Sequence, residues 1–187
     1  MLTSFRPSPF LPSQLHWQPA QQRRLPPLVR DWLLDTGSLT ARLRRHGRFA
    51  VRLLQEGISA PTATEARFAG LSARQHARIR EVELLLDDQP MVYARSVLPL
   101  TSLTGANRVL GHMARRSLGW ELFRLPMASR DAVWITEVDG ERLPHPQSGE
   151  QLWGRESLFR KRGQPILVAE FFLPALWTRV LAETDGE

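Results

Sequence analysis

The clearest pattern in the chain is a pair of stretches, residues 78–99 and 153–174, in which strand-like apolar runs surround a short polar turn. In the first, Asp87-Asp88-Gln89-Pro90 separates two such runs, and these residue types are typical of turns. In the second, Arg162-Gly163-Gln164-Pro165 precedes the apolar run 166–173. We therefore predict two β-hairpins.

The two stretches also match residue for residue. Arg80 matches Arg155 and Pro99 matches Pro174, an offset of 75 residues at which an Arg-Glu, a Gln-Pro, an Ala and a Leu-Pro recur. This agreement indicates a duplicated unit, with chance matching of so short a piece as the alternative. The position of Arg95 in the first copy is held by Glu170 in the second.

The expected pairing of the first hairpin places two arginines on one face of the sheet. If Leu86 pairs with Met91, Val82 lies opposite Arg95, and Arg80 and Arg95 are diagonal neighbours. The other residues of that face are apolar, so the face is expected to be buried. Because buried guanidinium groups are costly without anions, we expect an anionic ligand there.

Glu170 lies in the second hairpin, within the continuous apolar run 166–173 that is typical of a strand covered on both faces. A buried carboxylate has to pair with a cation or take up a proton. It is therefore a candidate acid–base group. The alternative is that Glu170 only forms a structural ion pair with an arginine.

Other patterns complete the predicted fold. Residues 49–56 and 132–138 are strand-like, which brings the count to six, and the short turns favour antiparallel pairing. We predict an α+β fold with a six-stranded antiparallel sheet and helical flaps over it. Helices are predicted over 28–37, 39–46 and 107–115, a short turn over 118–123, and a loop or short helix over 62–70. The predicted segments are an irregular N-terminal arm (1–24), a single domain (25–178) with a flexible insertion (139–151), and a C-terminal tail (179–187).

Composition excludes several classes of protein. The 187 residues contain no cysteine, which rules out disulfides and thiolate chemistry, and no apolar run is long enough to cross a membrane. We therefore expect a soluble cytoplasmic protein. The net charge of +6 comes almost entirely from scattered arginines, Lys161 being the only lysine, and no recognition motif accompanies it. Nucleic acid is thus not an expected partner.

Motifs for cofactors and metals are also missing. The sequence lacks GxGxxG, P-loop, HExxH and GxSxG patterns, and its five histidines do not have ligand spacing. We predict no metal and no cofactor, which leaves Arg80, Arg95 and Glu170 as the candidate chemistry.

Several segments, taken in order, resemble the bacterial chorismate pyruvate-lyases over roughly residues 25–177. The matching segments are Asp31-Trp32-Leu33-Leu34, Ser38-Leu39-Thr40, Arg80-Glu81-Val82, Thr101-Ser102-Leu103-Thr104-Gly105, Ser117-Leu118-Gly119, Ser129-Arg130-Asp131, Leu152-Trp153-Gly154-Arg155 and 163–175. The resemblance implies a monomer that converts chorismate to 4-hydroxybenzoate and pyruvate, the first step of ubiquinone biosynthesis. Because an enclosed apolar pocket with charged groups should also hold the product well, we predict product inhibition.

The resemblance also assigns residues. It implies that Arg80 binds a carboxylate, that the backbone of Leu118 contacts the ligand, and that Glu170 lies near the aromatic hydroxyl. Leu39 takes the place of a methionine of the family's flap. Arg95 takes that of a second arginine, and we expect it to act in catalysis with Glu170 by neutralising the departing pyruvyl carboxylate. The alternative is a small-molecule-sensing domain of the same fold, but such regulators carry a DNA-binding domain for which the first twenty-odd residues are too short.

Overall fold

A computed structural model describes residues 15–72, 74–113, 116–143 and 151–184. The elements are β1 (Gln18–Pro19), η2 (Ala20–Gln22), α1 (Pro27–Leu33), α2 (Leu39–Leu43), β2 (Phe49–Ser59), α3 (Ala63–Ala69), β3 (Ala77–Leu86), β4 (Gln89–Pro99), η3 (Leu100–Ser102), η4 (Gly105–Gly111), α4 (Leu118–Phe123), β5 (Ser129–Asp139), η5 (Gly140–Arg142), β6 (Gln151–Lys161), β7 (Gln164–Phe172) and α5 (Pro174–Thr184).

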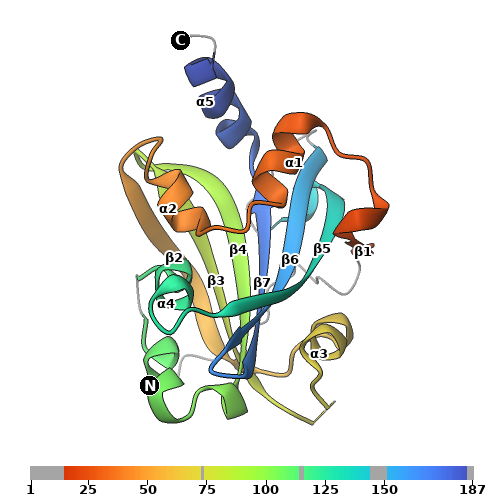
Figure 1. The fold of residues 1–187 in the computed structure, drawn as a ribbon, viewed down its shortest axis with the longest axis vertical. Helices are drawn as coiled ribbons and strands as arrows, with labels where there is room; N and C mark the ends of the chain where they lie inside the picture. Colours follow the sequence, from red (N-terminus) through yellow and green to blue (C-terminus); the bar gives the residue numbers. More distant parts are fainter. Residues whose placement is uncertain (1–14, 73, 114–115, 144–150, 185–187) are drawn as a thin grey trace.

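All the strands form one antiparallel sheet in the order β1-β5-β6-β7-β4-β3-β2 (Figure 1). The α+β class is confirmed, but the described part of the sheet has seven strands, so the predicted number of six is wrong. The additional strand is β1, which pairs with Trp134 and Ile135 at the edge of the sheet. It lies in the segment predicted as an irregular arm. A strand of two residues leaves no periodic pattern in the sequence, so it could not be predicted.

Two other predicted segments can be compared with the structure. Helix α5 continues to Thr184 and so includes most of the predicted C-terminal tail, and Figure 1 shows it extending beyond the sheet. Of the predicted insertion 139–151, residues 144–150 lie outside the described residues. The helix predicted over 107–115 is a 3-10 helix over Gly105–Gly111.

Both predicted hairpins are confirmed, and each has a two-residue turn. Asp87 and Asp88 have φ of 48° and 69°, and Arg162 and Gly163 have φ of 54° and 78°. Positive φ at both central residues is typical of the type I′ turn, whose twist matches that of the flanking strands. The turn is thus tighter than the four-residue cluster predicted from sequence, and Leu86 pairs with Gln89.

This tight turn and one additional residue on β4 change the predicted register. The pairing shifts between Leu84 and Leu85, and beyond this bulge Arg80 lies opposite Ser96 and Glu81 lies opposite Arg95. The predicted pairing of Val82 with Arg95 is therefore wrong. Since a shift of one residue turns a side chain to the other face, Arg80 and Arg95 lie on opposite faces of the sheet.

The structure supports the duplication and refines its alignment. Inside the edge strand β1, the strands β5-β6-β7 have the same order as β2-β3-β4 counted from the other edge. Arg95 pairs with Ala169 where the two halves meet. Beyond the bulge, the pair Arg80–Ser96 corresponds to the pair Arg155–Glu170. Ser96, rather than Arg95, is thus the counterpart of Glu170.

The face that carries Arg95 buries a cluster of charges. Its guanidinium donates from Nε to Glu65 Oε1 at 2.7 Å and from Nη1 to Glu81 Oε1 at 2.5 Å. Glu65 also closes a capping box with Thr62 at the start of α3, which holds that helix on this face. Burial opposes the charge of Arg95, but the two glutamates outweigh it and raise its pKa. Glu156 lies on the same face, and its Oε2 has no hydrogen-bond partner among the described residues. Burial and the charge of Glu65 raise the pKa of Glu156, and the charge of Arg95 opposes this shift.

We predict that Arg95→Met lowers the free energy of unfolding by about 3–5 kcal/mol, because Glu65 and Glu81 lose their shared cation inside the protein. Urea unfolding followed by circular dichroism measures this change. The control is Arg48→Met, whose partner Asp88 is exposed, and which should change stability by less than about 1 kcal/mol. Equal effects of the two substitutions would contradict the prediction.

We also predict that Glu156→Gln weakens the pH dependence of stability. Since the pKa of Glu156 is raised in the folded state, stability falls as pH rises from the ordinary glutamate pKa towards this higher value. The glutamine of the variant does not titrate, so the variant does not lose stability in this way. The Tm of the variant minus the Tm of the wild type should therefore increase between about pH 5 and about pH 8. Exposed Glu141→Gln is the control, and parallel curves for wild type and Glu156→Gln would refute the prediction.

Candidate active site

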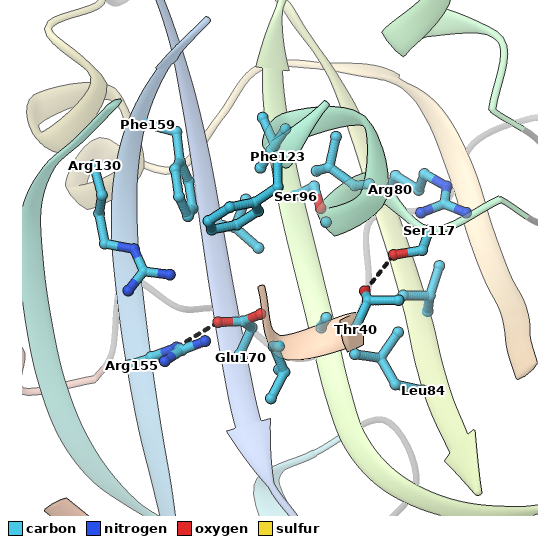
Figure 2. A pocket seen from close by; sticks show the side chains of 17 residues that line it. Thr40, Arg80, Leu84, Ser96, Ser117, Phe123, Arg130, Arg155, Phe159 and Glu170 are labelled. Atoms are coloured by element: carbon cyan, nitrogen blue, oxygen red, sulfur yellow. Dashed lines mark hydrogen bonds and ion pairs between the residues drawn. The ribbon is translucent and has the colours of Figure 1, made fainter. Parts of the chain in front are cut away.

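A small cavity lies between the sheet and the helices α2 and α4 (Figure 2). The strands contribute alternate side chains to its floor, and the helices form its lid. The lining residues are Leu39, Thr40, Arg80, Val82, Leu84, Ala94, Ser96, Ser117, Leu118, Gly119, Leu122, Phe123, Arg130, Arg155, Phe159, Val168 and Glu170. Its free volume is about 40 Å³, whereas a cavity that holds benzene in another protein has about 150 Å³, so an aromatic ring can enter only if the lid moves outward.

Arg80 lies on β3 at one end of the cavity and is 1% exposed. Its Nη2 donates to the carbonyl oxygen of Arg116 at 3.0 Å, just before α4. Burial lowers the pKa of Arg80, and the charge of Glu56 opposes this shift. The residue across from it on β4 is the neutral Ser96, and the residue across from it on β2 is Glu56.

Glu170 lies on β7 and forms an ion pair with Arg155, its neighbour on β6. The Arg155 Nε donates to Glu170 Oε2 at 2.5 Å, and Nη1 donates to the carbonyl oxygens of Trp32 and Leu33 at 3.0 and 3.1 Å. Arg155 therefore orients the carboxylate and also binds the C-terminal end of α1. Arg155 is not among the site residues predicted from sequence, although the repeat aligns it with Arg80.

Arg130 is a second cavity residue that was not predicted from sequence, although it belongs to the matched segment Ser129-Arg130-Asp131. It lies on β5, its guanidinium is 4.9 Å from the centre of the Phe159 ring, and its Nη1 donates to the carbonyl oxygen of Asp35 at 2.5 Å. Burial and the nearby charge of Arg155 lower the pKa of Arg130 to about 10. Figure 2 shows Arg130, Arg155 and Glu170 on one side of the cavity and Arg80 on the other.

The lid consists of two short helices that touch each other. Ser38 and Ser117 cap α2 and α4, and the Thr40 Oγ1 lies 2.5 Å from the Ser117 Oγ. Gly119 permits this contact, since a Cβ there would lie 2.8 Å from Thr40 Oγ1. Leu39 and Leu118, the first residues of these helices, close the cavity from above.

Four of the five residues predicted from sequence line this cavity: Arg80, Leu118, Leu39 and Glu170. Arg95 does not, because the bulge on β4 places it in the charge cluster on the other face, where it cannot reach the pyruvyl carboxylate as predicted. The described residues include no group of three or more His, Asp or Glu side chains suited to a metal ion. Within that same part of the chain, no helix has the length and apolar character needed to cross a membrane.

This arrangement can bind a flat, partly apolar molecule with charge at both ends. Phe123 and Phe159 provide aromatic surface in the middle, and guanidinium groups at either end can pair with carboxylates. Glu170 adds one group that can accept or donate a proton at an end of the cavity.

Solved structures share the fold at low sequence identity. The gene product SA0254 from Staphylococcus aureus is 16% identical, with a TM-score of 0.55 over 75% of this chain and 90% of that chain. The C-terminal domain of the histidine utilization repressor from Pseudomonas syringae is 11% identical, with a TM-score of 0.51 over 68% and 93%. At this identity the likeness concerns the fold alone.

Sequence relatives are much closer. A protein of Alcanivorax borkumensis named "Probable chorismate pyruvate-lyase" is 53% identical over 175 residues, which cover 91% of this chain and 83% of the relative. A protein of Thiobacillus denitrificans with the same name is 40% identical over 88% of this chain and 92% of the relative. The family model described as chorismate lyase matches residues 11–182. The resemblance inferred from the motifs is confirmed, and the chain belongs to the chorismate lyase family.

Proposed function

We propose that this protein is a chorismate pyruvate-lyase, an enzyme that converts chorismate to 4-hydroxybenzoate and pyruvate as the first step of ubiquinone biosynthesis. Family membership supports this function, and one observation in the structure carries it: Arg80 and Glu170 face the same enclosed cavity from β3 and β7. These strands are two strand spacings apart, about 10 Å at the backbone. Side chains that converge over that distance suit the carboxylate and the hydroxyl at opposite ends of a six-membered ring.

The roles of the cavity residues follow from this placement. Arg80 pairs with the ring carboxylate, and the backbone of Leu118 contacts the same end. Leu39 covers the ring as an apolar part of the lid, and Glu170 meets the substituents at C4. Arg95 is assigned no contact with the substrate, since it belongs to the opposite face.

The reaction needs no redox step. The bond between ring C3 and the ether oxygen breaks, the hydrogen at C4 is removed, and the enolpyruvyl methylene gains a hydrogen, so that the products together contain all the atoms of chorismate. Aromatisation of the ring drives the reaction. The protein therefore has to fix the geometry and stabilise developing charge, with Glu170 as the acid–base or hydrogen-bonding group near C4.

We further propose that the enzyme acts as a cytoplasmic monomer without a nucleic-acid partner. Residues of this one chain line the cavity on the sheet side and on the lid side, which supports the monomer. A sensing domain of the same fold is the rival function, since the similar repressor domain belongs to a regulator. Incubation with chorismate decides between them: an enzyme forms 4-hydroxybenzoate, detected by its absorbance, whereas a sensor binds a ligand and leaves chorismate unchanged.

We predict that Glu170→Gln lowers kcat by about 10²–10⁴-fold, because the amide cannot exchange a proton near C4. Steady-state formation of 4-hydroxybenzoate measures the change. Glu83→Gln is the matched control, since Glu83 is buried in the same sheet but pairs with Arg52 on the other face. Near-full activity of Glu170→Gln would exclude the acid–base role.

We also predict product inhibition that depends on the lid. The tight cavity should retain 4-hydroxybenzoate, and Thr40→Val removes the hydrogen bond between α2 and α4, so the variant should bind product more weakly and show less inhibition. Progress curves with added 4-hydroxybenzoate measure both effects. Thr178→Val, in α5, is the control. Wild-type curves that are unaffected by added product would contradict the prediction.

A further inference from the structure

The proposed substrate has two carboxylates, and the roles given above account for only one of them. Arg80 pairs with the carboxylate on the ring. The second carboxylate belongs to the enolpyruvyl group, which is attached at C3, next to the C4 hydroxyl that Glu170 meets. A cation for it should therefore lie beside Glu170, on the side of the cavity away from Arg80. The following inference rests on the proposed function.

Arg130 lies at that place, and at least one of its N–H donors has no partner among the described residues. Its side chain is half-buried and passes over Phe159 into the cavity lining. Nη1 donates to the carbonyl oxygen of Asp35, whereas the buried Nε has no hydrogen-bond partner among the described residues. A guanidinium group carries five N–H donors, so a carboxylate can bind here without displacing the contact with Asp35.

The carboxylates near Arg130 are already engaged with other groups. Glu170 accepts from Arg155 Nε at 2.5 Å, and Asp35 accepts from Arg42 and from the backbone nitrogen of Gly37. Arg130 and Arg155 thus bring two positive charges to this end of the cavity. Their mutual repulsion is part of what lowers the pKa of Arg130 to about 10, after the larger effect of burial. An incoming anion would relieve both effects.

We propose that Arg130 binds the carboxylate of the enolpyruvyl group and is the second substrate-binding arginine of the site. The side chain is held in place by contact with the Phe159 ring and by the carbonyl oxygen of Asp35 at its tip. As the C3–O bond breaks, negative charge moves onto the departing enolpyruvate, so this contact strengthens during the reaction. The aromatic product lacks the second carboxylate. Arg130 therefore contributes to the binding of chorismate but little to that of 4-hydroxybenzoate.

The experiment compares substrate with product for three variants. We would measure kcat/KM for chorismate, and the affinities for chorismate and 4-hydroxybenzoate by quenching of tryptophan fluorescence, in Arg130→Met, Arg130→Lys and Arg160→Met. Arg160 pairs with Asp131 beside Arg130 but is exposed and outside the cavity, so it is the matched control. Circular dichroism and Tm confirm folding of each variant.

The expected result is a fall of at least about 30-fold in kcat/KM for Arg130→Met, with product affinity within about threefold of wild type. Arg130→Lys should recover at least about tenfold of the loss, because the charge is restored. A change below threefold in kcat/KM, or a parallel loss of product affinity, would overturn the proposal. If the wild type does not convert chorismate, the proposed function fails instead, and chorismate affinity of Arg130→Met alone decides whether Arg130 binds the second carboxylate.

Discussion

A guanidinium group removed from water needs anions or several acceptors around it, and this sheet buries arginines on both of its faces. On one face, Arg95 shares two glutamates with which it forms a closed cluster. On the other, Arg155 pairs with Glu170, while Arg80 and Arg130 turn toward the cavity. The division between a structural arginine and those lining the cavity follows from which face each strand position occupies.

The two matching hairpins place an arginine at the same position, but the two arginines have different surroundings. Arg80 and Arg155 are counterparts, and each lies across from a residue on the neighbouring central strand. In one half that residue is Glu170, which neutralises Arg155 and becomes the acid–base candidate. In the other half it is Ser96, which has no charge. The proposed site thus uses the first arginine for an external carboxylate and the second to orient an internal one.

The sequence could predict the parts of this design that depend on local pattern. Apolar runs and turn residues located both hairpins, and the burial of Glu170 followed from its place in such a run. The register could not be predicted, because it depends on a turn in which Asp87 and Asp88 both adopt positive φ and on a bulge that adds one residue to β4. Neither feature has a distinct residue signature, since the turn lacks the glycine that usually marks it. Arg130 was missed for a related reason, because its reach into the cavity depends on the pairing of β5 with β6 and on the position of Phe159.

The only lysine of the chain bears on how the lid can move. Lys161 Nζ donates to the carbonyl oxygens of Glu121, Arg124 and Pro126 at 2.8, 2.7 and 2.6 Å, at the end of α4. A compact ammonium group with three donors suits carbonyl oxygens that converge on one point, whereas the planar fork of arginine would not fit them, which explains a lysine in so arginine-rich a sequence. Because this contact fixes the C-terminal end of α4 to β6, we expect the lid to open at the opposite end. That end carries Ser117 and Leu118. It is joined to α2 by the hydrogen bond between Thr40 and Ser117, and to β3 by the donation from Arg80 to the carbonyl oxygen of Arg116, so opening the lid there has to break both contacts.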